Sequence, residues 1–222
     1  MRVDELKTLE PPALVRERAV EEVRHAIISG ELAPGTRLIE RELCSAMGIS
    51  RGSVREMVRL LQAERLVDVE PRRGPTVATL SRKQAREIYE IRGMIESLLV
   101  RRFTERATDA DIEALRAIIA QVKAAAAEVV PKRIVGLMQR FNEHLMAVVQ
   151  HDIAREILEG INARISWLRL RALSKPGRTE TSMGELSDIL DAVEHRDPER
   201  AARFMRICVD NACEAALEQL SE

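Results

Sequence analysis

Prolines are scarce in the second part of this chain, and their scarcity constrains its fold more than any other feature. The chain has 222 residues and 8 prolines, of which only Pro131, Pro176 and Pro198 follow residue 80. A proline inside a helix removes a hydrogen bond and clashes with the preceding turn, so long proline-free stretches permit long helices. We therefore place a boundary near residues 78–82 and expect two domains, 10–79 and 80–222.

Apolar residues in the second part recur at helical spacing. Two such stripes are Ile88, Ile91, Ile95 and Leu98, and then Ile157, Ile161, Ile165 and Leu168. Aromatic residues make up only 2% of the chain, which disfavours a core built from strands. The pattern predicts a mainly α fold, with an antiparallel bundle of about six helices in the second domain. Asp109 is expected to cap the second of these helices. The expected helices span residues 82–107, 109–129, 132–150, 153–173, 181–195 and 199–219.

The first domain is predicted to contain three helices followed by a β-hairpin. The helices span residues 13–29, 39–47 and 51–62. Residues 66–70 alternate as a strand does, residues 71–74 form a turn, and residues 76–78 return as a second strand. Two helices joined by a short turn and followed by a small hairpin make an N-terminal winged helix-turn-helix. The residues of the third helix that are expected to point inward are Val54, Met57, Val58 and Leu61.

The third helix has the features of a helix that reads DNA. A basic stripe opposite its apolar face consists of Arg51, Arg55 and Arg59. Ser50 is a suitable N-cap, and the small residues after it let backbone N–H groups approach a phosphate. Residues 49–76 contain six arginines against four acidic residues, and the hairpin turn contributes Arg72 and Arg73 to that count. We interpret these features together as a DNA-binding surface, whereas a merely solvated helix face is the alternative.

Other classes of protein are disfavoured by composition and motifs. Apolar residues make up 45% and charged residues 32% of the chain, an ordinary globular composition with a net charge of −1. No apolar run is long enough to cross a membrane, and the first 20 residues lack the apolar core of a signal peptide, so we expect a cytoplasmic protein. A Gly-rich phosphate loop, G-x-S-x-G and H-E-x-x-H are absent from the sequence, so we expect no enzymatic activity.

The first domain resembles the winged helix-turn-helix of GntR-type bacterial transcription regulators. The resemblance rests on residues 28–38, 40–43, 49–56 and the wing at 69–77. The helical remainder resembles, more loosely, the FCD domain of the FadR branch of this family. The resemblance implies a homodimer that binds double-stranded DNA at a short palindromic operator. The DNA contacts that it implies are Arg41, Ser50, Arg51, Gly52, Ser53, Arg55, Arg73 and Gly74.

Two of these positions depart from the family pattern. Members commonly carry threonine or proline where this chain has Gly52 and Ser53. The short side chains here would remove a contact to a base or a sugar.

Many FCD domains hold a divalent metal inside the bundle, and the metal binds a small carboxylate effector. The resemblance aligns the four ligand positions, which are Asp or His in the family, with Met138, Asn142, Leu186 and Cys208. One thiolate among Met, Asn and Leu does not hold a divalent ion, so we expect no metal cofactor. We expect these residues and Arg92 to form an apolar, weakly polar effector pocket. Three histidines are assigned to helix ends or to another helix face: His144, His151 and His195.

Several assignments remain open between alternatives. Arg92 either pairs with Glu96, one turn along its helix, or binds an effector carboxylate. The pocket either binds an uncharged or amphipathic ligand, or has lost its ligand. Trp167, Arg169 and Arg171 are assigned to helix packing and a solvated face. The favoured function is a ligand-responsive, dimeric transcription regulator, most often a repressor. The alternative is a metal-independent small-molecule sensor or storage protein without specific DNA binding.

Overall fold

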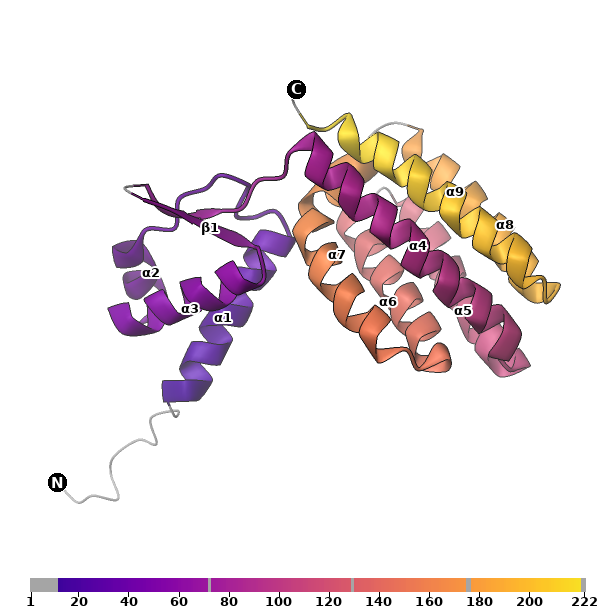
Figure 1. Ribbon diagram of the computed structural model, residues 1–222, viewed down its shortest axis with the longest axis horizontal. Coiled ribbons are helices and arrows are strands. Elements are labelled where there is room, and N and C mark those ends of the chain that lie inside the picture. Colours follow the sequence, from indigo (N-terminus) through magenta and orange to yellow (C-terminus); the bar gives the residue numbers. More distant parts are fainter. Residues whose placement is uncertain (1–11, 72, 129, 175–176, 221–222) are drawn as a thin grey trace, which may run out of the picture. The chain divides into compact units, whose positions relative to one another are not determined.

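The structure is a computed structural model that describes residues 12–71, 73–128, 130–174 and 177–220 (Figure 1). The chain divides into two compact units between Thr79 and Leu80, which we call unit 1 and unit 2. The described part of unit 1 contains three helices and a two-stranded hairpin, and that of unit 2 contains helices. The mainly α fold and the winged helix-turn-helix are therefore confirmed. None of the described helices is both long and apolar enough to cross a membrane.

The elements of unit 1 follow the predicted order. Its helices and strands are α1, Pro12–Ile28; α2, Glu40–Met47; α3, Arg51–Ala63; β1, Val67–Glu70; and β2, Gly74–Val77. The return strand begins earlier than predicted, because Gly74 pairs with Glu70 and is not part of the turn. Gly74 has a φ of 76°, a left-handed conformation that glycine adopts without steric cost. All four inward residues predicted on α3 are buried: Val54, Met57, Val58 and Leu61.

Local signals shape the turn between α2 and α3. Gly48 ends α2 in a left-handed conformation, with φ 65° and ψ 28°. Ser50 is the N-cap of α3, and its hydroxyl oxygen accepts a hydrogen bond of 3.1 Å from the backbone N–H of Ser53. The N-terminal residues of α3 are thereby held in place for contact with a partner.

Unit 2 is a bundle in which α4 and α9 run side by side (Figure 1). Its helices agree with the six predicted ones to within a few residues at each end. Asp109 is not the N-cap of α5. Thr108 caps this helix, and the carboxylate of Asp111 accepts a hydrogen bond from the backbone N–H of Thr108. The helices are α4, Arg82–Arg106; α5, Asp109–Ala127; α6, Pro131–Val149; α7, Asp152–Leu173; α8, Arg178–Glu194; and α9, Pro198–Leu217.

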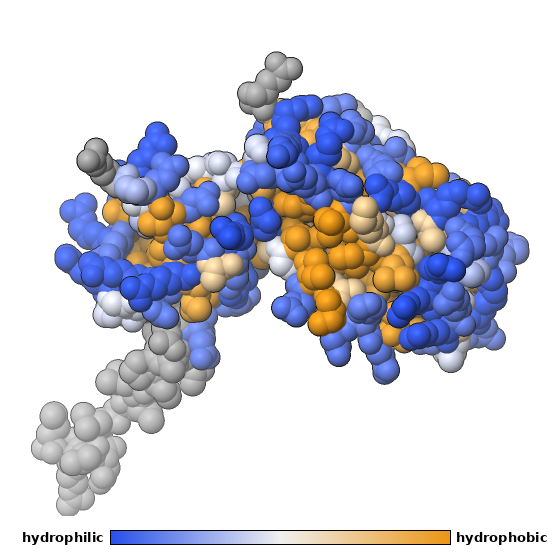
Figure 2. All heavy atoms as spheres, viewed as in Figure 1, coloured by the Kyte–Doolittle hydropathy of each residue, from blue (hydrophilic) through white to orange (hydrophobic). Residues whose placement is uncertain are grey.

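The bundle core uses only part of the predicted apolar stripes. On α4, Ile88 is buried but Ile91 is 44% exposed, because the helix turns Tyr89 and its neighbours toward the core instead. The exposed residues on α4 and α7 include Ile91, Met94, Ile153 and Ile157. Figure 2 shows apolar surface gathered over these two helices. Unit 2 therefore has a buried apolar core and a separate apolar face on its surface.

Candidate nucleic-acid interface and ligand cavity

The basic stripe of α3 points into solvent. The side chains of Arg51, Arg55 and Arg59 are 75%, 69% and 77% exposed. The opposite face of the helix is buried in unit 1. A helix anchored on one face and basic on the other can enter the major groove of DNA, which is about 12 Å wide.

Glu40 binds two of the three stripe arginines and was missed in the sequence. Nε of Arg55 donates a hydrogen bond of 2.9 Å to Oε2 of Glu40, and Nε of Arg51 lies 3.8 Å from Oε1. This hydrogen bond, together with the negative charge of Glu40, raises the pKa of Arg55. The two arginines are thus held together at the start of α3 in the absence of DNA. The sequence feature that could have identified this contact is the position of Glu40 as the first residue of α2, the helix before α3.

The remaining predicted DNA contacts are also accessible. Arg41 is exposed on α2, and Gly52 is exposed near the start of α3. A Cβ atom at Gly52 would lie 3.6 Å from Oγ of Ser50, an ordinary contact, so this position has room for a side chain. Arg73 is 78% exposed in the hairpin turn and lies 3.2 Å from Glu70. Arg72 lies outside the described residues. In Figure 1 the hairpin turn and the start of α3 lie toward the same end of unit 1.

Unit 2 contains a cavity of about 80 Å³ enclosed by α4, α6, α7, α8 and α9. It brings together four of the five residues predicted for an effector pocket: Arg92, Met138, Leu186 and Cys208. The fifth, Asn142, lies beside the cavity, where its amide nitrogen is 3.4 Å from Oε1 of Glu96. The other lining residues are Tyr89, Glu96, Ile134, Arg169, Ala172, Leu173, Arg178, Ser182, Met183, Met205, Val209 and Ala212.

Arg92 and Glu96 form a buried ion pair on α4, as one of the two alternatives predicted. Nε and Nη2 of Arg92 donate to Oε1 of Glu96 at 3.0 and 2.9 Å. The guanidinium also lies over the ring of Tyr89, 5.0 Å from its centre. Burial opposes the charge of Arg92, but the neighbouring Glu96 outweighs this effect and raises the pKa of Arg92. Among the described residues, Nη1 of Arg92 has no hydrogen-bond partner.

Arg169 also lines the cavity, which corrects its assignment to a solvated face. Burial lowers the pKa of Arg169 to about 10, and the positive charge of Arg92 contributes to this shift. The sequence could have indicated that Arg169 points inward, because it lies one helical turn after Ile165, which is buried. The wall is mostly apolar, but it also contains Arg92, Arg169 and Arg178. The other two residues fit the prediction, since Trp167 packs against the core and Arg171 is exposed.

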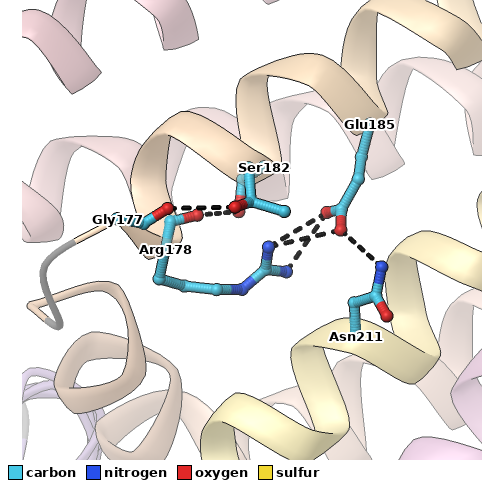
Figure 3. Close-up of polar contacts among 6 residues, drawn as sticks. Gly177, Arg178, Ser182, Glu185 and Asn211 are labelled. Carbon is cyan, nitrogen blue, oxygen red and sulfur yellow. Dashed lines mark hydrogen bonds and ion pairs between the residues drawn. The ribbon is translucent and has the colours of Figure 1, made fainter.

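A second, part-buried ion pair joins Arg178, which lines the cavity, to Glu185 (Figure 3). Nη1 and Nη2 of Arg178 each lie 3.2 Å from Oε2 of Glu185, and their side chains are only 11% and 9% exposed. Oε1 of Glu185 accepts a hydrogen bond of 2.8 Å from Asn211 on α9. This contact ties α8 to α9. Sequence reasoning missed the pair, although a separation of seven residues places both side chains on one helix face.

The positions that the resemblance aligns with the family's metal ligands hold Met138, Asn142, Leu186 and Cys208 in this chain. Burial, reinforced by the Glu185 carboxylate, raises the pKa of the Cys208 thiol. Leu186 offers no donor atom. The structure contains no group of three or more His, Cys, Asp or Glu side chains, among the residues it describes, that could hold a metal ion.

The histidines lie elsewhere in unit 2. Nε2 of His144 is 2.8 Å from the carbonyl oxygen of Asp111, and its ring packs against Phe103. His151 is the N-cap of α7, and His195 is the C-cap of α8. All three positions agree with the sequence-based assignment.

Comparison with known proteins matches both units to families. Residues 15–77 match the family of bacterial regulatory proteins called the gntR family, and residues 87–211 match the FCD domain. The chain belongs to the gntR family. Its members are DNA-binding transcription regulators, and the FCD domain is the part that binds an effector. Helix α3 lies within the gntR match, and all cavity residues except Ala212 lie within the FCD match.

Individual relatives of this family member cover nearly the whole chain. The HTH-type transcriptional regulator YdhC of Bacillus subtilis is 27% identical over 221 residues, which are 99% of this chain and 98% of the relative. The HTH-type transcriptional repressor RspR of Escherichia coli is 26% identical over 197 residues, or 89% and 86% of the two chains. The solved structure of E. coli McbR/YncC has a TM-score of 0.78 at 21% identity and covers 92% of this chain and 98% of that chain, which shows a shared fold.

Proposed function

We propose that this regulator is a homodimeric repressor that reads a palindromic operator with α3 and releases it when a small molecule occupies the cavity of unit 2. The observation that carries the proposal is the exposed arginine stripe on a helix whose opposite face is buried. A repressor is favoured because a relative, RspR, is named as one. Because the partner is DNA, we place the protein in the bacterial cytoplasm. Its role is regulatory rather than catalytic.

The apolar face of unit 2 supports a dimer. Met94 is 54% exposed on α4, and Ile153 is 61% exposed on α7. Exposed apolar patches of this kind on monomeric proteins commonly mark interaction sites. We assign the face to a second copy of this chain, because a palindromic operator needs two reading helices related by two-fold symmetry.

Helix α4 is the proposed link between the cavity and DNA binding. It begins just after the boundary between the units and carries three residues that line the cavity: Tyr89, Arg92 and Glu96. Nη1 of Arg82 donates to the carbonyl oxygen of Leu217 at 2.6 Å, which joins the start of α4 to the end of α9. A ligand that prefers one arrangement of these helices would shift the population toward it and change operator affinity.

The test is a selection of duplexes from a random-sequence library with the full chain, followed by titration of the enriched DNA. We expect one short palindrome to be enriched and to bind more tightly than unrelated DNA by about 10³-fold or more. Binding should weaken as salt is raised, because phosphate contacts release counterions. A library that yields no common sequence would favour the alternative of a sensor or storage protein without specific DNA binding.

A further inference from the structure

We propose that the cavity of unit 2 is an anion site, which binds a small organic carboxylate directly on Arg92 and Arg169 and excludes the divalent cation that many FCD domains hold. The inference rests on the proposed function, in which this cavity is the effector site. It differs from the family pattern in the groups that recognise the ligand, which here are guanidinium groups of the chain itself.

The buried charges near the cavity do not balance. Three guanidinium groups line it, from Arg92, Arg169 and Arg178. Glu96 pairs with the first and Glu185 with the third. Among the described residues, no carboxylate lies within ion-pair distance of Arg169. One positive charge is therefore left over in a partly buried site, and a ligand with one negative charge would neutralise it.

The hydrogen-bond donors point to the same ligand. Arg92 is only 5% exposed, and its Nη1 atom lacks a partner among the described residues. Buried donors are normally satisfied, so an unpaired guanidinium nitrogen on a residue that lines the cavity indicates a missing acceptor. A carboxylate has two oxygens in the geometry that guanidinium groups bind best. The lowered pKa of Arg169 is consistent with a site that lacks its counter-charge.

The volume of the cavity and the apolar part of its wall define the part of the ligand other than its carboxylate. A volume of about 80 Å³ has room for roughly half a dozen water molecules, so the ligand has only a few non-hydrogen atoms. Apolar side chains on the opposite helices include Ile134, Met138 and Leu186. They favour a short hydrocarbon body over a second charged group.

A divalent cation does not fit the same cavity. Leu186 offers no ligand atom, and neither Met138 nor Asn142 supplies an imidazole or a carboxylate. The unpaired positive charge of Arg169 would also repel a cation in a site of low dielectric constant. The same residues that disfavour a metal therefore favour an anion.

Isothermal titration of the full chain with butyrate and with butyramide tests the proposal. The two probes have the same shape and differ in charge. A chelator is present in both titrations, and a third titration replaces the chelator with zinc. We expect butyrate to bind at least about tenfold more tightly than butyramide. Equal affinities, no butyrate binding up to about 10 mM, or binding that appears only when zinc is added would each overturn the proposal.

A matched pair of variants locates the site. Arg169→Met removes the unpaired charge, and Arg171→Met removes an exposed arginine from the same helix. We expect the first to reduce butyrate affinity about tenfold or more and the second to leave it unchanged. The melting temperature of Arg169→Met without ligand should be equal or higher, because the fold disfavours this charge. Butyrate affinity that is unchanged in Arg169→Met would overturn the assignment.

The two proposals fail in distinguishable ways, because ligand binding is measured without DNA. Butyrate binding without selection of any palindrome would contradict the proposed regulator and leave the anion site standing. Selection of a palindrome without butyrate binding would contradict the anion site alone.

Discussion

Glu40 of α2 accepts a hydrogen bond of 2.9 Å from Nε of Arg55 on α3. The contact joins the two helices of the helix-turn-helix and involves an arginine expected to read DNA. An acidic group beside that arginine would repel phosphates, but it also orients the guanidinium before DNA arrives. We therefore expect Glu40 to restrain binding to DNA of any sequence while it positions Arg55.

Replacing Glu40 tests this restraint. Glu40→Gln removes the charge, so we expect affinity for random duplex DNA to rise several-fold and the advantage of the operator over random DNA to shrink. Fluorescence anisotropy at several salt concentrations measures both quantities. Glu22→Gln, an exposed change on α1, is the control and should leave both unchanged. Lower affinity for random DNA in Glu40→Gln would contradict the proposed role.

The stripe arginines should determine operator affinity. Arg51→Ala or Arg55→Ala should cost about 1–3 kcal/mol on operator DNA, because each removes a contact to a base edge. The melting temperature should change little, since both side chains are exposed. Arg203→Ala, an exposed change on α9, serves as the control. Unchanged operator affinity in both stripe variants would refute the assignment of α3 to the major groove.

The apolar face of unit 2 should hold the dimer together. Met94→Lys combined with Ile157→Lys places charges in that face, and an unpaired buried charge is strongly unfavourable in an interface. We expect the mass measured by light scattering to fall from that of a dimer, twice 25.0 kDa, to that of a monomer of 25.0 kDa. The control Ile207→Lys alters an isoleucine on α9 that is 46% exposed, and it should stay dimeric. A double variant that keeps the dimer mass would assign the interface to another face.

Carboxylate binding should depend on pH through Arg169. Its pKa is lowered to about 10, so the guanidinium is charged at neutral pH and loses its charge as the pH rises through 10. Butyrate affinity should therefore be constant from about pH 6 to 9 and fall above about 10. The charged and titratable groups that face it are Arg92, Glu96, Arg178, Glu185, Tyr89 and Cys208.

The other groups should not interfere in this range. Burial raises the pKa of both Tyr89 and Cys208, so both side chains stay neutral while Arg169 is charged. Calorimetric titrations at several pH values provide the measurement, with Arg171→Met as the control. Affinity that rises between pH 9 and 11 would contradict the role of Arg169.

The purified protein should contain well under one equivalent of zinc or nickel. The family's ligand positions hold Met138, Asn142, Leu186 and a protonated Cys208, so no binding energy should link a metal to the folded state. Elemental analysis gives the metal content, and a chelator should leave the melting temperature unchanged. Stoichiometric metal bound in unit 2 would show that the alignment of these four positions is wrong.

The sequence by itself determined the elements of this protein, because their limits depend on neighbouring residues. Ser50 and Gly48 mark the ends of α3 and α2 through a side-chain cap and a left-handed backbone, and both signals are local. The four buried residues of α3 were predicted because that helix has a single apolar stripe, so spacing alone identifies its inner face.

The tertiary structure decided which groups share the cavity and which apolar stripe is buried. Helix α4 has two candidate faces, and only its packing against α6 and α9 selects the one with Tyr89 over the one with Ile91. Arg92, Arg169 and Arg178 come from three helices and meet because the bundle folds them together. Periodicity assigns a residue to a face of its own helix. It contains no information about which other helix that face will meet, because that choice depends on the free energy of packing the whole bundle.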